Sequence, residues 1–294
     1  MKKLLFLLTI LIVAGFFLNS CLKEPKAPDA GYDVTETGVN STQLIEAPLD
    51  VFLQADRAIR LQRDSIVARN INQSTFSFKI GYINFTVSPA DTVTFPKTVT
   101  VDFGTDTSKS YTGKMILKLN GNMRNNGANC AITYVNLITG KSSITGIDSI
   151  ISSGKNNGNI ITRYNMHGGH LVGSGNKNIT YSGRVISKFN LTTGNNVLDS
   201  VEINATDANQ FVYKLYSVPV YKLQLASDCN YFNSGVIISD IKINNVLTGN
   251  MAFDFGYSPS GYTNACDANG AIYAYSYLNK SYQQQFLFFA KKFQ

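Results

Sequence analysis

Two histidines, the only ones in the chain, lie close together in the segment YNMHGGHLVG. His167 and His170, with Met166 beside them, offer the nitrogen and sulfur ligands that suit a soft or borderline metal ion. Two glycines separate the histidines and the sequence places no third ligand near them, which favours an exposed hairpin loop. His167 and His170 are the metal candidates of the chain, but the interpretation is that no metal or other cofactor is bound.

Hydrolytic chemistry finds little support in the residue types. A Ser/His/Asp triad would need one of the same two histidines, and the sequence contains no Gly-x-Ser-x-Gly nucleophile motif. Paired carboxylates that cleave glycosidic bonds are the remaining alternative, if Asp102, Asp254 and Asp267 converge in space. Aspartates at strand ends are usually solvated turn residues, so we expect a protein that is not an enzyme.

A ligand platform is suggested by the tyrosines of AIYAYSYLNKSY, near the end of the chain. Tyr273, Tyr275 and Tyr277 fall on one face of an expected strand. If that face is exposed, it can bind a glycan or a partner protein; if it is buried, it belongs to the core. The core interpretation is favoured because aromatic residues are ordinary strand formers.

The charge pattern argues against a nucleic-acid partner. Only 15% of the residues are charged and the net charge is +7, two units of which belong to Lys2 and Lys3. No dense run of Lys and Arg is interleaved with aromatic residues, as a nucleic-acid groove requires.

The first residues have the layout of a secretory signal peptide. Lys2 and Lys3 precede an uncharged apolar run from Leu4 to Leu18, and Asn19 and Ser20 come before a cysteine. The run is short for a membrane-spanning helix, which needs roughly 20 apolar residues. We therefore expect residues 1–20 to be a signal peptide.

Cys21 stands where cleavage should fall, and LNSC resembles a loose bacterial lipobox. The resemblance implies that Cys21 is acylated, for example with palmitate, and anchors the chain in a membrane. The residue after it is Leu22 rather than Asp, which points to the outer membrane. Whether the body faces the cell surface or the periplasm stays open at this point.

Three further cysteines are available for a disulfide in an oxidising compartment, namely Cys130, Cys229 and Cys266. The preferred pair is Cys229 with Cys266, because both lie near strand ends in the same C-terminal region. Spacing alone leaves Cys130 open as an alternative partner.

The segment between anchor and body divides into two parts. Residues 21–48 hold three prolines among Gly, Thr and Asn, and we interpret them as a lipidated flexible tether. Residues 49–70 then have no Gly or Pro and carry Asp56 four positions before Arg60, which predicts a short amphipathic helix. Its apolar face consists of Phe52, Ala55, Ile59 and Ile66.

Residues 71–294 show the alternation of a β body. Apolar and polar residues alternate at Phe76–Tyr82, Val99–Phe103, Met115–Leu119 and Cys130–Tyr134, with Asn-Gly turn signals at positions 120, 126, 157 and 269. Neighbouring strands joined by such turns are antiparallel, and no helical crossover separates them. The predicted fold is an all-β antiparallel sandwich, or a strongly curled barrel-like sheet, of about a dozen strands after one short helix.

A repeated triplet, Asp-Phe-Gly, ends the segments VTVDFG and MAFDFG. Without the other motifs of a protein kinase, it is interpreted as a strand end. Phe103 and Phe255 should enter the core, Asp102 and Asp254 should point outward, and a turn should follow.

The wider segments FPKTVTVDFG, NGANCAITYVNLIT and MAFDFGYSPSGYTNACDANG resemble a family of uncharacterised Bacteroidetes lipoproteins. The likeness covers most of Phe76 to Tyr277. It implies the β body and the lipid anchor and brings no catalytic residues. Four Asp-Ser/Thr-apolar triplets, beginning at Asp64, Asp91, Asp148 and Asp199, also resemble acceptors of protein O-glycosylation in that lineage.

Taken together, the sequence predicts a lipid-anchored outer-membrane protein that is a non-enzymatic structural or binding module. Its partners would be the membrane, through the lipid anchor, and a glycan or an envelope protein. The first alternative is a surface glycan-binding or adhesion protein. The second is a glycan hydrolase with paired carboxylates.

Overall fold

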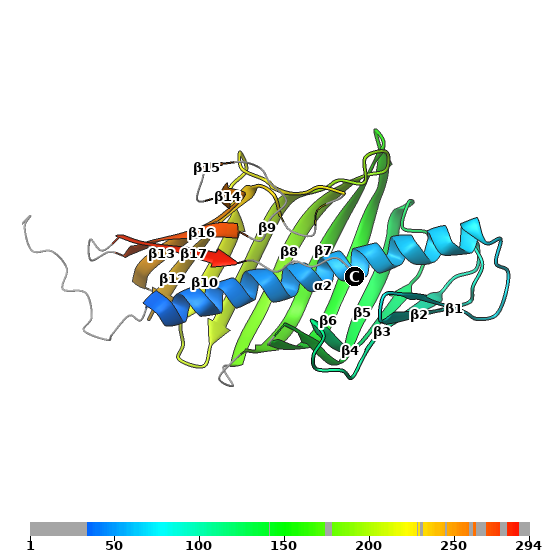
Figure 1. Ribbon diagram of the computed structural model, residues 1–294, viewed down its shortest axis with the longest axis horizontal. Coiled ribbons are helices and arrows are strands. Elements are labelled where there is room, and N and C mark those ends of the chain that lie inside the picture. The colour runs from blue at the N-terminus through cyan, green and yellow to red at the C-terminus, as the bar shows by residue number, and fades with distance from the viewer. Residues whose placement is uncertain are drawn as a thin grey trace, which may run out of the picture. The chain divides into compact units, whose positions relative to one another are not determined.

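The computed structural model describes residues 34–258, 261–262, 269–276 and 281–287, apart from residues 141, 174–177, 228, 230–231 and 245 (Figure 1). The expected signal peptide, Cys21 and residues 22–33 of the expected tether lie outside these residues. None of the helices in the described ranges combines the length and the apolar character needed to cross a membrane.

One antiparallel sheet dominates the fold, and its order along the main path is β1 to β10, β12, β13, β16 and β17. Each strand on this path pairs with the one before it, and β11 pairs with β9 beside the path. The strands are β1 (Phe76–Ile80), β2 (Ile83–Ser88), β3 (Lys97–Gly104), β4 (Tyr111–Leu119), β5 (Asn126–Thr139), β6 (Ser142–Asn156), β7 (Asn159–Val172), β8 (Asn178–Asn190), β9 (Asn196–Asp207), β10 (Val212–Ser217), β11 (Leu223–Leu225), β12 (Gly235–Ile243), β13 (Val246–Phe255), β16 (Asn269–Ser276) and β17 (Ser281–Leu287). A separate pair is formed by β14 (Tyr257–Ser258) and β15 (Gly261–Tyr262). The predicted antiparallel all-β fold is confirmed, and it is built around one large sheet of 15 strands.

The strands follow from alternation along the sequence. In β3 every second residue is buried, so that Val99, Val101 and Phe103 line the core. The turns between long strands also follow from the sequence. Between β6 and β7, Asn157 and Gly158 have φ angles of 46° and 76°. These positive values are those that Asn-Gly supplies in a two-residue hairpin.

The Asp-Phe-Gly triplets are strand ends, as interpreted. Phe103 and Phe255 are buried, and the glycines that follow them have positive φ angles. Asp102 is half-buried, but Asp254 is only 8% exposed, which corrects its expected outward position. Asp254 lies opposite Val236 of β12. Asp254 is buried although strand alternation places it on the face of β13 opposite to that of Phe253 and Phe255.

The helix α2 (Val34–Ala68) is much longer than predicted. Residues 34–48, which the sequence assigned to a flexible tether, form its first half, and its last residue lies close to the expected end at residue 70. The predicted apolar face is confirmed, since Phe52, Ala55, Ile59 and Ile66 are all buried. The expected tether therefore has at most the residues before Val34 available to it.

The sheet curls around α2, which crosses the strands (Figure 1). Residues of α2 contact strands from β4, through Tyr111, to β12, through Ser239. Phe52 in the middle of α2 stacks on Tyr164 of β7, with ring centroids 5.1 Å apart. Because strands distant in the sheet contact the same helix, both faces of α2 are covered over much of its length.

Polar contacts explain why the first half of α2 is helical despite a poor sequence. Gly38, Asn40 and Pro48 all disfavour helix interiors. The side-chain nitrogen of Asn40 donates to Asp207 Oδ2 and to the Tyr213 hydroxyl, each at 3.0 Å. Tertiary contacts thus offset the weak local preference.

Asp50 makes a second buried anchor at the middle of α2. Its carboxylate accepts hydrogen bonds from the Tyr111 hydroxyl at 2.8 Å, from the Thr139 hydroxyl at 2.8 Å and from Gln54 Nε2 at 3.2 Å. Burial raises the pKa of Asp50 to about 6, although these hydrogen bonds act in the opposite direction. These three hydrogen-bond donors to the Asp50 carboxylate are all uncharged groups.

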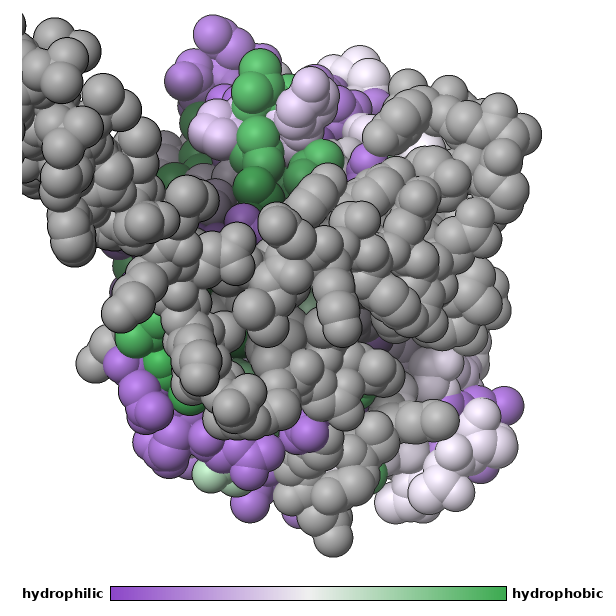
Figure 2. Space-filling view, turned by 90° about the vertical axis from the view of Figure 1, so that its left-hand side faces the viewer, coloured by the Kyte–Doolittle hydropathy of each residue, from purple (hydrophilic) through white to green (hydrophobic). Residues whose placement is uncertain are grey.

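Large apolar side chains are exposed at only a few positions of the described surface. Among the residues with described side chains, the most exposed large apolar ones are Val220 at 84% and Val93 at 80%. In the view of Figure 2, hydrophilic residues make up most of the coloured margin, with smaller hydrophobic groups at the top and at the lower left. Single exposed apolar residues are normal on a folded protein and indicate no docking site by themselves.

Candidate binding cleft beside the helix

A cleft of about 330 Å³ opens beside the second half of α2. It lies between this half of the helix, the turn from β8 to β9, and β11 with the residues that follow it. Its lining residues are Leu53, Gln54, Arg57, Arg60, Leu61, Asp64, Arg124, Phe189, Leu191, Gly194, Asn196, Leu225, Ala226 and Ser227. Three of them are arginines, and Asp64 is the one carboxylate among these residues.

Arg60 is held firmly in one wall of the cleft. Its Nη1 lies 2.5 Å from Asp56 Oδ2, and its guanidinium carbon lies 3.6 Å from the centre of the Phe189 ring. A planar cation stacked on an aromatic face and paired with a carboxylate loses little further freedom on binding a ligand. Burial raises the pKa of Asp56, and Arg60 offsets part of that rise by its charge and its hydrogen bond.

Arg57 lies one helical turn before Arg60 and lines the same cleft. Residues three apart on a helix are neighbours on its surface, so the two positive groups lie close together. Burial lowers the pKa of Arg57, and the charge of Arg60 lowers it further. Both effects disfavour the charged form, and a negative charge in the cleft would relieve them.

Arg124 completes the positive wall from the connection between β4 and β5. Its Nη2 lies 3.9 Å from Asp64 Oδ1, while Arg63 Nη1 lies 3.6 Å from the same oxygen. Asp64 is 64% exposed, so water screens both contacts and they stabilise little. The carboxylate at the rim therefore neutralises only part of the positive charge.

The other residues of the lining are largely apolar. Leu53 and Leu61 lie beside Arg57 on α2, Phe189 is near the end of β8, Leu191 directly follows that strand, and Leu225 belongs to β11. Asn196 and Ser227 add polar groups to the lining. A concave site with an apolar wall and a few placed polar groups is the usual form of a small-molecule pocket.

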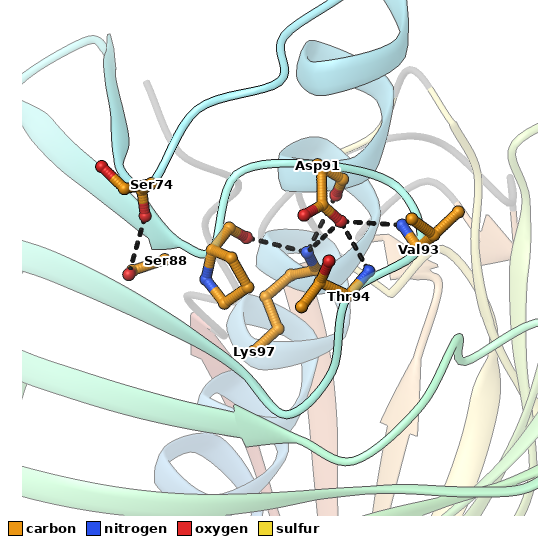
Figure 3. A network of polar contacts seen from close by, with 7 residues as sticks. Ser74, Ser88, Asp91, Val93, Thr94 and Lys97 are labelled. Atoms are coloured by element: carbon orange, nitrogen blue, oxygen red, sulfur yellow. Dashed lines mark hydrogen bonds and ion pairs between the residues drawn. The ribbon is translucent and has the colours of Figure 1, made fainter.

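A second cavity, of about 50 Å³, touches the same half of α2 and is lined by the loop between β2 and β3. Lys97 closes this region: it is 2% exposed, and its ammonium donates to the carbonyls of Pro89 and Asp91, at 2.8 Å each. Figure 3 shows these contacts together with the bonds from the amides of Val93 and Thr94 to the Asp91 carboxylate. Because Lys97 already has its partners and the volume suits about one or two waters, this cavity is part of the scaffold.

Asp91 organises the loop that covers Lys97. Hydrogen bonds from the Thr94 side chain and backbone lower the pKa of Asp91 to about 2, and Lys97 adds to this effect. The ammonium nitrogen of Lys97 lies 3.6 Å from Asp91 Oδ1 and 5.1 Å from the centre of the Phe95 ring. The loop is thus fixed against the sheet beside the cleft.

The two histidines lie within β7, which corrects the expected hairpin loop. His167 pairs with Ile147 and His170 with Thr145, and an irregularity in the strand register separates them. Both side chains are exposed. Alternation is broken at the two glycines by a bulge, a feature that the turn-like sequence concealed. In the described ranges no cluster of three or more His, Cys, Asp or Glu could hold a metal ion.

Among the described contacts, the ring of His167 meets a serine but no carboxylate that could orient it. Ser149 Oγ lies 3.5 Å from His167 Nε2, whereas the nearby Asp148 reaches only the backbone nitrogen of His167, at 3.3 Å. The Asp148 carboxylate is buried and accepts hydrogen bonds from the hydroxyls of Tyr134 and Tyr164. The arrangement lacks the Asp-to-imidazole bond of a catalytic triad.

The three aspartates considered for glycoside cleavage are not brought together by the described contacts. Asp102 belongs to β3 and pairs with Lys114, at 2.8 Å. Asp254 belongs to β13, and the strands β4 to β10 and β12 lie between β3 and β13 in the sheet order. Asp267 lies outside the described residues.

The two cysteines in the described part of the chain are in different states. Cys130 is free and buried, and burial raises the pKa of its thiol to about 12. Cys229 is in a disulfide. Cys266, its predicted partner, lies outside the described residues, so the pairing stays a prediction.

The tyrosine platform is described only through the strand register. Tyr273 lies opposite Ala252 and Tyr275 opposite Asn250, whereas the buried Met251 and Phe253 of β13 face other positions of β16. Ala252 and Asn250 are half-buried. Tyr277 lies outside the described residues. The register thus pairs both tyrosine positions with half-buried residues of β13 rather than with Met251 and Phe253.

The four Asp-Ser/Thr-apolar triplets occupy different environments. Thr92 is exposed on the loop between β2 and β3, whereas Ser65, Ser149 and Ser200 are half-buried in α2, β6 and β9. The loop site is therefore the most accessible of the four in this structure.

Comparison of the chain with protein-family models, curated proteins and solved structures finds no match in any of the three.

Proposed function

We propose that the protein is a non-enzymatic, lipid-anchored binding module of the outer membrane whose ligand enters the cleft beside α2. The observation that carries the proposal is the cleft itself, which combines three arginines with several apolar residues in a volume of about 330 Å³. This volume lies in the range of small-molecule pockets.

The scaffold around the cleft supports a binding role. Arg60 is fixed by Asp56 and Phe189, so its orientation is set before any ligand arrives. α2 itself is anchored by the hydrogen bonds of Asn40 and Asp50 to the sheet. Preorganised groups on rigid elements reduce the entropy that binding costs.

The cleft is tested by filling it. Ser227 is exposed at the cleft and Ser108 is exposed on the loop between β3 and β4. We expect wild type and Ser108→Trp to bind the same members of a small-molecule fragment collection in saturation-transfer NMR, and Ser227→Trp to lose them. If Ser227→Trp binds the same fragments as wild type, or no fragment binds wild type, the cleft is not the binding site.

The lipid anchor is tested separately at Cys21. Cells grown with labelled palmitate should incorporate the label into the wild-type protein of the outer-membrane fraction, and Cys21→Ser should carry no label and leave that fraction. Labelling of Cys21→Ser would contradict the anchor. Protease treatment of intact cells then reports the side: loss of the β body places it at the surface, and protection places it in the periplasm.

Glycan binding through β16 is the alternative that one observation favours, since Tyr273 and Tyr275 alternate with positions opposite buried core residues. Tyr275→Ala should then lower binding to a glycan array and leave the thermal unfolding midpoint unchanged. An unchanged array profile would leave the cleft as the better candidate.

A further inference from the structure

We infer that the cleft binds a small amphiphilic organic anion, with one negatively charged head against Arg57, Arg60 and Arg124 and an apolar body against the apolar residues of the lining. The inference rests on the proposed function, namely that the cleft is a ligand site. It adds the chemical class of the ligand.

The charge balance of the lining favours an anion. Arg57, Arg60 and Arg124 face one carboxylate, Asp64, which is mostly exposed and is shared with Arg63. Asp56 pairs with Arg60 at 2.5 Å and neutralises part of the charge of that arginine. The described lining therefore retains positive charge in a partly enclosed space, where water screens it less than on an open surface.

Guanidinium groups also select the shape of the charged head. Each offers several N–H donors in a plane, which matches the two oxygens of a carboxylate or the oxygens of a phosphate or sulfonate. Arg57 and Arg60 come from one helical face, and Arg124 reaches the cleft from another element. Arginines that line one cleft from two elements can bind a single head group together.

The apolar residues of the lining require an apolar body on the same molecule. They are Leu53 and Leu61 beside the arginines of α2, Leu191 and Leu225 from other elements, and Phe189, on which Arg60 stacks. An inorganic anion would leave this surface in contact with water, whereas an apolar body buries it at about 25 cal/mol per Å². The volume of about 330 Å³ limits the body to one or two rings or a short chain.

The direct test uses two probes that differ in one group. 1-Anilinonaphthalene-8-sulfonate carries a sulfonate, and N-phenyl-1-naphthylamine has the same rings without it. We expect the sulfonate probe to bind wild type with saturable fluorescence, at least about tenfold tighter than the neutral probe, as hydrogen bonds to charged groups imply. Benzoate should displace the sulfonate probe at lower concentration than sodium phosphate does.

Arginine variants locate the binding. Arg57→Gln and Arg124→Gln should each weaken the sulfonate probe about tenfold and change the neutral probe little. Arg163→Gln, at an exposed position of β7, is the matched control and should bind both probes as wild type does. Arg124 is 38% exposed, so its variant tests the inference even if Arg57→Gln fails to fold.

The outcomes separate the two proposals. Equal affinity for both probes, or affinity unchanged in Arg57→Gln and Arg124→Gln, with both probes lost in Ser227→Trp, overturns the anionic class and keeps the cleft as a ligand site. Displacement by phosphate as readily as by benzoate overturns the apolar body. If neither probe binds, or if Ser227→Trp binds both as wild type does, the inference and the proposed function fall together.

Discussion

The two halves of α2 belong to one helix but meet different surroundings. The first half, from Val34 to Pro48, is enclosed by strands near the end of the sheet and bonds to them through Asn40 and Ser41. The second half, from Leu49 to Ala68, carries the arginines and borders both cavities. Both halves are anchored to the sheet, the second through Asp50 and Phe52, but only the second half also presents a face to the cleft.

The largest expected difference between the halves lies in their leucines. Leu44 is completely buried, and Leu44→Ala should lower the free energy of unfolding by about 3 kcal/mol, through lost burial and the cavity left behind. Leu61 lies at the cleft and is half-buried, so Leu61→Ala should cost less than about 1 kcal/mol. Urea unfolding measures both, and equal losses would remove the distinction between the halves.

Asp50, near the boundary of the halves, gives a pH-dependent difference. The pKa of Asp50 is about 6 in the folded protein, against 3.8 for an unperturbed aspartate such as that of the unfolded chain. The folded state therefore binds more protons than the unfolded state between these two pH values. Stability from this group is therefore present below pH 4 and is lost as the pH rises to about 6, by about 3 kcal/mol in total.

Asp50→Asn removes this titration. Relative to wild type, its stability should rise between pH 4 and pH 6 as the wild type loses its share. Urea unfolding at a series of pH values measures the difference. A constant offset between the two proteins across this range would show that the folded Asp50 titrates normally.

Asn40 tests the polar anchor of the first half. Asn40→Ala removes two buried hydrogen bonds to Asp207 and Tyr213 and should destabilise the protein by about 2 kcal/mol. Ser65→Ala, at a half-buried position of the second half, is the control and should change stability by less than about 0.5 kcal/mol. Thermal unfolding of both variants decides whether the anchor lies where the structure places it.

The smallest effect is expected at Gln62 in the second half. Its Oε1 is buried and has no hydrogen-bond partner among the described residues, while Nε2 donates to the carbonyl of Ile59 at 3.1 Å. Gln62→Met keeps the volume and removes the unsatisfied oxygen, so stability should stay equal or rise by up to about 1 kcal/mol. A clear loss in urea unfolding would reveal a polar role for this side chain.

The sequence predicts the sheet better than the helix. Alternation at Val99, Val101 and Phe103 is a local signal, and the strand that contains them was found from it. The first half of α2 was missed because Gly38, Asn40 and Pro48 oppose a helix locally. Its stability comes from partners far along the chain, which no window of sequence contains.

The cleft was missed for a related reason. Arg57 and Arg60 lay in a predicted helix, but nothing marked them as more than solvated charges. Arg124 and Phe189 are far from them in sequence and join them only through the fold. For His167 and His170 the sequence wrongly predicted a hairpin loop, because the glycines of a bulged strand resemble those of a turn. The spacing of Arg57 and Arg60 was the one available signal.

The position of α2 also sets an order of events during folding. Strands that neighbour each other in the sheet are mostly neighbours along the chain, so they can zip together as local hairpins. α2 comes first in the chain, yet Asn40 bonds to Asp207 and Tyr213, which lie 167 and 173 residues later. If the chain crosses a membrane N-terminus first, the helix waits for β9 and β10 to arrive before its first half can dock. During that interval its apolar residues need a chaperone or early strands to shield them.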